Sequence, residues 1–331
     1  MRWLRNPSRG RAHGAIGFAT AGLAGVAAVA AVVVGAGQAG SSGSSAARAA
    51  VAHHAVATHV KCGDVITTNA RLTRDLNNCP GDGVVIGASG VTLDLHGHTI
   101  DGIGAGTGVK NSGGYDRVTV KDGRVHQFMD GIRLQGADRN RLSRLTVSLN
   151  AGQGVALETS DANRLERLSS MDNAGDGIFL GLDSDGNRVS GITASDNGTS
   201  GITVTEGVAG AGASERNLIE RSFLVRNATF GIALEQGSSN AQLKRNLAVA
   251  NQLDGIFVDL TSAGTLVSSN AASENLDDGI DVENAAATIA RNSANENGNL
   301  GINAVQGVTD GGGNRARGNG NAAQCTHVVC S

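Results

Sequence analysis

A glycine followed by an aliphatic residue recurs along most of this chain at nearly constant intervals. The sequence has 331 residues, and most of these glycines lie 22 to 24 residues apart, with one interval of 30 that contains the insertion at 207–215. They are Gly108, Gly131, Gly154, Gly177, Gly201, Gly231, Gly255, Gly279 and Gly301. A period of this length is typical of a solenoid, in which each repeat packs only against its neighbours.

The residues that follow each repeat glycine alternate between apolar and variable positions. The first is always isoleucine or valine, and the third is leucine or valine from the repeat of Gly131 to that of Gly279. This alternation predicts a strand with one buried face, and a further apolar column upstream predicts a second strand. Glycine and Asn/Asp interrupt the chain too often for a helix. We therefore predict an all-β solenoid of about ten coils.

Two columns of asparagine run through the repeats. One lies four residues before the glycines: Asn150, Asn173, Asn197, Asn227, Asn251, Asn275 and Asn297. In stacked coils such side chains can hydrogen-bond to those above and below. Five residues earlier, apolar side chains in the first repeats are replaced by Asn246, Asn270 and Asn292. We predict that these three are buried and hydrogen-bonded to one another.

The first fifty residues differ from the rest. Four arginines precede a run rich in Ala, Gly and Val over 15–35. This pattern predicts a secretory signal peptide over 1–39, followed by a flexible linker over 40–60 and the solenoid over 61–331. An uncleaved membrane anchor is the alternative, because the run is long enough to span a bilayer.

Export would change the charge balance of the protein. Without residues 1–50 the chain has 22 basic and 30 acidic residues, a formal charge of −8. This charge disfavours nucleic acid and anionic membranes as partners, and we expect a secreted monomer.

The four cysteines lie in two pairs at the two ends of the predicted solenoid. Disulfides form in exported proteins, and local pairing is favoured in an elongated fold. We predict the disulfides Cys62–Cys79 and Cys325–Cys330. The spacing does not suit zinc.

The segment VTLDLHGHTIDG at 91–102 and the repeats of the form N-x-L…N-x-x-x-G-I-x-L resemble right-handed parallel β-helix proteins. The most similar group is the NosD-like, carbohydrate-binding and sugar-hydrolase type. The resemblance covers about residues 62–310. It implies the fold and an extracellular or cell-wall polysaccharide as a partner. It does not imply one activity, because the fold includes lyases, hydrolases, epimerases and non-catalytic binders.

Carboxylates gather on the coils of Gly231, Gly255 and Gly279. Four of them are expected on one outward face: Glu235, Asp259, Asp281 and Glu283. Like charges on neighbouring strands repel one another, so a bound cation, a raised pKa or solvent must relieve them. Oxygen ligands of this kind suit Ca²⁺, the cofactor that we consider for this chain.

A second acidic group resembles the catalytic aspartates of polygalacturonases. Asp254, Asp277 and Asp278 fall in register with the N-T-D and D-D motifs of that family, and the resemblance implies an acid and a base. Gln252 and Leu300 depart from the family's asparagine and histidine. Asp-Gly is also an ordinary turn dipeptide, which is the alternative interpretation.

Arginines form a column on the other strand, six residues before the turn asparagines. They are Arg144, Arg167, Arg221, Arg245 and Arg291. Spaced guanidinium groups could bind the carboxylates of a uronate polymer. A solvated, charge-balanced face is the alternative.

These patterns favour a secreted, non-catalytic protein that binds carbohydrate or a surface. Outward aromatic residues, which sugar clefts usually contain, are limited to Phe179 and Phe257 on the first predicted strand. A polyuronate hydrolase or lyase with its site on the coils of Gly255 and Gly279 is the second hypothesis. A calcium-stabilised spacer is the third.

Overall fold

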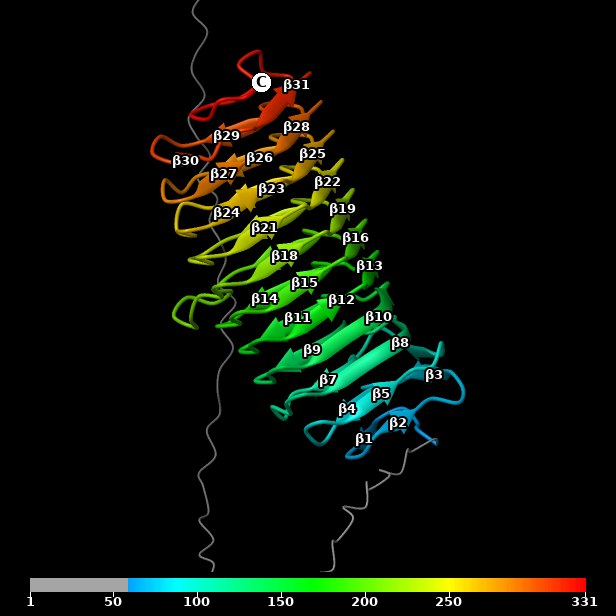
Figure 1. The fold of residues 1–331 in the computed structure, drawn as a ribbon. Helices are drawn as coiled ribbons and strands as arrows, with labels where there is room; N and C mark the ends of the chain where they lie inside the picture. Colours follow the sequence, from blue (N-terminus) through cyan, green and yellow to red (C-terminus); the bar gives the residue numbers. More distant parts are fainter. Residues whose placement is uncertain (1–58) are drawn as a thin grey trace, which may run out of the picture. The chain divides into compact units, whose positions relative to one another are not determined.

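The computed structural model describes residues 59–331, which form a parallel β-solenoid of eleven coils (Figure 1). The predicted signal peptide over 1–39 and nearly all of the linker over 40–60 lie outside the described residues. Each coil passes through three parallel sheets, which we call the first, second and third sheets. The prediction of an all-β solenoid of about ten coils is confirmed.

The first sheet has eleven strands, which follow the repeat glycines in the regular part of the chain. They are β1 (Asp64–Ile66), β4 (Val84–Ile86), β7 (Thr107–Asn111), β9 (Asp130–Gln135), β11 (Val155–Glu158), β14 (Ile178–Gly181), β17 (Ile202–Val204), β20 (Ile232–Leu234), β23 (Ile256–Val258), β26 (Ile280–Val282) and β29 (Ile302–Ala304).

The second and third sheets share two long strands, β8 (Thr119–His126) and β10 (Arg141–Ser148). The second sheet also contains β2 (Ala70–Arg71), β5 (Thr92–Asp94), β12 (Arg164–Glu166), β15 (Arg188–Ser190), β18 (Leu218–Glu220), β21 (Gln242–Lys244), β24 (Leu266–Ser268), β27 (Thr288–Ala290) and β30 (Thr309–Asp310). The third contains β3 (Leu76–Cys79), β6 (Thr99–Gly102), β13 (Ser169–Met171), β16 (Thr193–Ser195), β19 (Phe223–Val225), β22 (Leu247–Val249), β25 (Ala271–Ser273), β28 (Ser293–Asn295) and β31 (Arg315–Arg317).

The second strand of the sequence prediction is therefore two strands in most coils. The chain bends between them at a residue in the left-handed region, such as Arg167 with φ 55° or Arg245 with φ 56°. We call this position the corner. Buried residues lie three apart across the bend, as Leu165 and Leu168 do, instead of two apart as within a strand.

Equivalent apolar residues lie directly above one another because the coils pair in register. Ile178 pairs with Ile202, and both are fully buried, as are the equivalent residues of the other repeats. The repeat glycine is required by close approach of the next coil. A Cβ atom on Gly177 would lie 2.6 Å from the carbonyl oxygen of Gly201.

Both predicted asparagine ladders are confirmed. In the turn ladder, Asn173 Nδ2 donates to Asn197 Oδ1 at 3.0 Å, and the same bond repeats along the column. In the second ladder, Asn246 donates to Asn270 at 3.1 Å and Asn270 to Asn292 at 3.2 Å. This ladder continues to Asn314, and all its members are buried. The ladders satisfy amide groups inside a core too narrow for water.

The predicted disulfides Cys62–Cys79 and Cys325–Cys330 are confirmed, and they lie at the first and last coils. Such bonds fit an oxidising compartment. Within residues 59–331 no helix has the length and apolar character needed to cross a membrane.

Candidate functional site

The residue before each repeat glycine forms a column at the edge of the first sheet, which is polar except at Phe230 and Leu300. Where this residue is Asp or Gln, its side chain accepts the backbone N–H of the same position one coil further on. Asp130 Oδ1 accepts from Gln153 at 3.0 Å, and Asp254 Oδ1 accepts from Asp278 at 2.8 Å. These aspartates therefore have a structural role, as the turn interpretation predicts.

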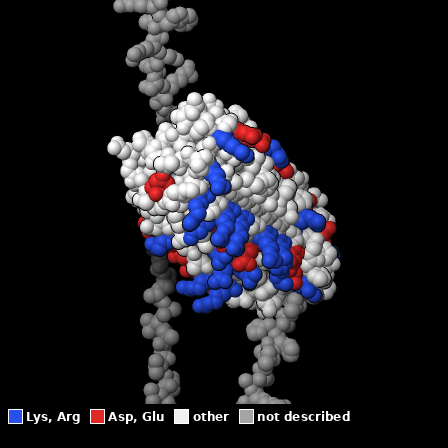
Figure 2. Space-filling model, turned by 45° about the horizontal axis from the view of Figure 1, so that its top comes forward, with Lys and Arg blue, Asp and Glu red and all other residues white. Residues whose placement is uncertain are grey.

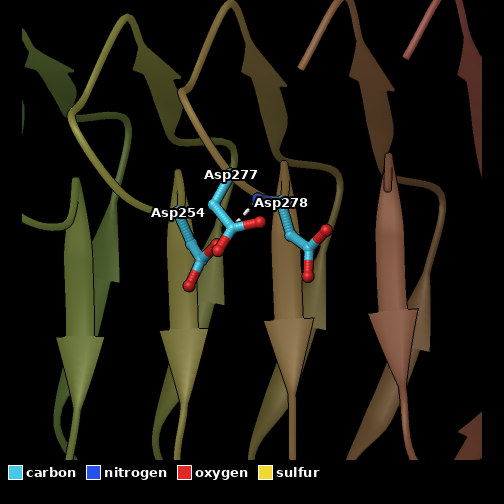
Figure 3. Close-up of side chains that lie close together, drawn as sticks. All are labelled: Asp254, Asp277 and Asp278. Carbon is cyan, nitrogen blue, oxygen red and sulfur yellow. Dashed lines mark hydrogen bonds between the residues drawn. The ribbon is translucent and has the colours of Figure 1, made fainter. Parts of the chain in front are cut away.

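Asp254, Asp277 and Asp278 come together on two neighbouring coils (Figure 3). One carboxylate oxygen from each lies within 4.8 Å of the others. Asp254 and Asp278 are buried at the starts of β23 and β26, whereas Asp277 is exposed in the preceding turn. We call these three residues the acidic cluster.

Burial of the acidic cluster disfavours the charged forms of its carboxyl groups. Burial raises the pKa of Asp254 to about 8, the N–H of Asp278 partly opposes this, and neighbouring carboxylates raise it further. Burial and the carboxylates of Asp278 and Glu283 likewise raise the pKa of Asp281 to about 7. The pKa of Asp278 is also raised, mainly by burial. At neutral pH this surface therefore holds protons on some of its carboxyl groups, which can then donate as well as accept hydrogen bonds.

The acidic cluster offers oxygen ligands to a hard cation such as Ca²⁺, which takes about six to eight of them. Among residues 59–331 it is the only group of three such side chains that converge on one point. One oxygen each of Asp254 and Asp278 already accepts a backbone N–H. Three ligands leave most of the coordination shell unfilled, so the cluster alone does not define a calcium site.

The other predicted calcium ligands do not converge on one point in the described chain. Asp259 accepts the N–H of Gln236 at 2.7 Å, the N–H of Thr261 at 3.0 Å and the hydroxyl of Ser262 at 2.6 Å. The carboxylate of Asp259 is therefore already occupied by hydrogen bonds, mainly within its own turn. Asp281 lies beside the acidic cluster on β26, Glu283 is exposed just after this strand, and Glu235 lines a hollow further along the sheet. Calcium binding by this column stays a prediction.

The spacing of the acidic cluster bears on the hydrolase hypothesis. The carboxyl groups of inverting glycosidases lie about 6.5–9.5 Å apart to admit water, and those of retaining enzymes about 5–5.5 Å. The carboxylate oxygens of the acidic cluster lie within 4.8 Å of one another, which is shorter than the inverting separation. The geometry is thus closer to that of a retaining enzyme than to the inverting arrangement of the polygalacturonase comparison.

A hollow of about 460 Å³ lies on the outer face of the first sheet, over the coils that precede the acidic cluster. Its lining includes Asp176, Phe179, Thr199, Thr203, Val208 and Phe230. Val208 belongs to the insertion that lengthens one repeat, and the insertion forms one wall.

Phe230 connects the hollow to the acidic cluster. Its ring stacks on that of Phe257, with centroids 4.9 Å apart and planes inclined by 13°. Phe179 and Phe257 were identified from the sequence but Phe230 was not counted, because Phe230 occupies a column that holds Asp, Gln or Ser in most other coils. An aromatic residue in a polar column was the available signal.

Comparison with known families agrees with this architecture. The family described as right handed beta helix region matches residues 82–211 and 210–327. The chain belongs to the right-handed β-helix family. No curated protein sequence matches it significantly. The match to the β-helix family is general, so membership of the NosD-like group stays a prediction.

Two solved structures of β-helix proteins are similar to this one. The Dettilon tailspike protein shares 14% identity at a TM-score of 0.60, over 83% of this chain and 62% of the tailspike chain. A mutant of the periplasmic alginate epimerase AlgG shares 14% identity at a TM-score of 0.55, over 80% of this chain and 76% of its own. This chain therefore spans less than two thirds of the tailspike, and at these identities the likeness shows the fold alone.

The predicted arginine column of this β-helix lies at the corner, away from the first sheet. All five side chains are exposed: Arg144, Arg167, Arg221, Arg245 and Arg291. Arg144 is paired with Asp122 at 2.5 Å. The column is thus a surface separate from the acidic cluster and the hollow.

Proposed function

We propose that this protein is a secreted, non-catalytic β-helix that binds an uncharged polysaccharide along the outer face of the first sheet. The observation that carries the proposal is the stacked pair of Phe230 and Phe257, which stands between the hollow and the acidic cluster. Together these features form one surface with aromatic, hydroxyl and carboxyl groups.

The chemistry of this surface suits sugar rings. A pyranose has an apolar C–H face and a rim of hydroxyl groups, and binding surfaces generally combine apolar area with a few oriented polar groups. Phe179 and Phe230 supply apolar area in the hollow. Asp176, whose pKa is raised by burial, accepts hydrogen bonds from the hydroxyls of Thr199 and Thr203 and lies where sugar hydroxyls would enter.

The charge of the surface favours an uncharged polymer over a polyuronate. The strands of the first sheet contain two basic residues, Lys110 and Arg133. Each is already paired with a carboxylate, Lys110 with Asp82 and Arg133 with Asp130 and Glu158. Carboxylates of a polyuronate would therefore meet acidic groups here without a free cation.

The similar solved structures support the general class of ligand. One is named an alginate epimerase, so a protein of this fold acts on a polysaccharide. The finer assignments, an uncharged polymer and a non-catalytic role, rest on the surface of this chain.

Binding to a panel of uncharged polysaccharides, such as dextran, galactomannan and β-glucan, tests the proposal. We expect binding to at least one polymer and a loss of about tenfold or more in Phe230→Ala, because burial of a phenylalanine ring contributes about 1.5–3 kcal/mol. Phe223→Ala is the matched control, since Phe223 is 41% exposed on the third sheet. Equal affinity of the two variants, or no binding by the unaltered protein, would overturn the proposal.

A second candidate is glycoside hydrolysis at the acidic cluster. It is favoured by the pKa of Asp254, about 8, which keeps this carboxyl group protonated at neutral pH as a general acid requires. Asp277 is exposed and could act as the partner carboxylate. Release of reducing ends from pectin, alginate or the uncharged panel, abolished in Asp254→Asn, would establish this activity. Binding without release supports the non-catalytic role.

A further inference from the structure

Lys and Arg gather on one face of the β-helix, with some carboxylates among them (Figure 2). Since the strands of the first sheet contain only Lys110 and Arg133, nearly all other described basic residues come from the second and third sheets and the turns beside them. The basic face is thus separate from the surface of the proposed function.

The corner arginines adopt a backbone conformation that glycine would suit better. Their φ angles lie between 51° and 56°. The left-handed region is unfavourable for residues with a Cβ atom other than Asn and Asp. Glycine occupies the equivalent corner at Gly191 and Gly313. The guanidinium groups are therefore held at positions where the local backbone alone does not favour arginine.

The carboxylates beside the corner are already paired with other bases. Glu166 binds Arg141 at 2.7 Å, and Glu220 binds Arg188. Within residues 59–331, no carboxylate forms an ion pair with the other four corner arginines: Arg167, Arg221, Arg245 and Arg291. Neighbouring coils lie about 4.8 Å apart, so adjacent members of this row repel one another unless an anion lies between them.

A hollow of about 410 Å³ interrupts the row at Ser269. Ser269 takes the corner position between Arg245 and Arg291, and its short side chain leaves space between their guanidinium groups. Lys244 and Ser268 also line the hollow, as does the carboxylate of Glu220, whose charge is offset by its ion pair with Arg188. Guanidinium, ammonium and hydroxyl donors around one space match a carboxylate or sulfate group.

We propose that the corner row binds an anionic polysaccharide, with one of its carboxylate or sulfate groups in the hollow at Ser269. The polymer would follow the row of Arg221, Arg245 and Arg291 along the stacking direction. A pyranose unit is about as long as the rise of one coil, so successive acidic sugars can meet successive guanidinium groups. Nucleic-acid interfaces are much broader and more positively charged than this single row, which is flanked by Glu166 and Glu220.

Binding of the full chain to polygalacturonate and to heparin tests the proposal and distinguishes carboxylate from sulfate. The test variant is Arg221→Gln/Arg245→Gln/Arg291→Gln. The control is Arg139→Gln/Arg216→Gln/Arg226→Gln, which removes three exposed, ion-paired arginines and the same charge. We expect the test variant to lose about tenfold or more in affinity and to lower the slope of log affinity against log salt by about 2–3, with little change in the control.

A stability measurement separates binding from a structural role. Arg291→Gly should leave the melting temperature unchanged or raise it, because glycine relieves the left-handed φ, and yet should weaken binding. Equal losses in the test and control variants, unaltered binding by Arg291→Gly, or binding of neither polymer would overturn the proposal. Equally tight binding of single-stranded DNA would overturn the assignment to polysaccharide. This test uses neither Phe230→Ala nor uncharged polymers. A negative result here would therefore be distinct from failure of the proposed function.

Discussion

Asp130 and Asp254 occupy the same position in two coils of one sheet, but their surroundings differ. Asp130 Oδ2 accepts from Arg133 at 2.7 Å, and Arg133 also reaches Glu158 of the next coil at 2.5 Å. Three residues after Asp254 the chain has Phe257 in place of an arginine, and the next coil adds Asp281 at the same register. One coil neutralises its acid with a base, whereas the other gathers further acids around it.

This difference shows which part of the column is only structural. Both aspartates accept a backbone N–H from the next coil, so that bond does not distinguish them. Arg133 forms an ion pair with the buried carboxylate of Asp130 and so offsets its charge. Asp254 has no such base, and its charge must be avoided by protonation or offset by a ligand. A surface that stays incompletely neutralised is more suitable for binding than one that is already paired.

The interior of the same two regions differs in a parallel way. Leu145 and Leu168 fill the position beneath the corner in the first region, whereas Asn246, Asn270 and Asn292 fill it in the second. Apolar packing tolerates small shifts of one coil against the next, but an amide ladder fixes their spacing. The coils that carry the acidic cluster are thus held in the more strictly ordered part of the core.

Replacement of Asn270 by leucine should give the largest effect. Asn270 accepts two hydrogen bonds from Asn246 and donates to the carbonyl of Leu243 and to Asn292. Leucine would leave several of these buried partners unsatisfied, so we expect a loss of about 3–5 kcal/mol in the free energy of unfolding. Urea denaturation measures it.

The matched control for this substitution is Asn77→Leu, because Asn77 is exposed on β3. A change within about 0.5 kcal/mol is expected there. If both variants had the same urea midpoint, the ladder would contribute nothing beyond packing, and the proposed difference between the two interiors would be lost.

Replacement of Arg133 by phenylalanine should give an intermediate effect, since it copies the arrangement at Phe257. Asp130 and Glu158 would lose their shared cation. We expect a loss of about 1–3 kcal/mol in the free energy of unfolding, measured by urea denaturation. The control is Arg139→Phe. The ion pair of Arg139 with Asp116 is long, at 3.9 Å, and exposed, so its loss should change the free energy of unfolding by less than about 1 kcal/mol. A larger loss in the control would contradict this account.

Much of the stacking could be predicted from the sequence because it depends on side chains of one type at one period. The repeat glycines, the columns beginning at Ile132 and Asn150, and the disulfides all have this property. The corner could not be predicted, because Arg167 and Arg245 do not carry the usual residue signal for a left-handed φ. The first three coils also lack the turn asparagine column, and eleven coils form where about ten were expected.

The candidate site was less predictable because it depends on where outward side chains turn. Asp259 and Glu283 share a column in the sequence, but Asp259 folds back onto Thr261 and Ser262. Phe230 reaches Phe257 of the next coil from a column that is polar in most other coils. The register of the repeats predicted that Asp254 lies near Asp277 and Asp278. That no Lys or Arg of the described chain pairs with them depends on how the surface folds.

The smallest effect is on the pH dependence of stability. The sign of this dependence tests whether Asp254 differs from Asp130. The pKa of Asp254 is about 8 in the folded chain and near its ordinary value of 3.8 when unfolded. Between these values the folded state holds a proton that the unfolded state lacks, so raising the pH lowers the free energy of unfolding. We expect the melting temperature to fall by a few degrees from pH 5 to pH 8.5. In Asp254→Asn the fall should be smaller, and this variant should be the more stable one at pH 8.5.

The same substitution at the equivalent position should act in the opposite direction. Asp130→Asn removes the acceptor of Arg133 and keeps the amide oxygen that accepts the N–H of Gln153, so it should lower the melting temperature at pH 8.5. Both variants remove one carboxyl group from one column, and a general effect of net charge would move them together. Thermal unfolding at pH 5 and pH 8.5 therefore distinguishes a local effect of each aspartate from a general effect of net charge. Shifts of the same sign would show that the two coils treat their aspartates alike, and the acidic cluster would then be no more than another set of turns.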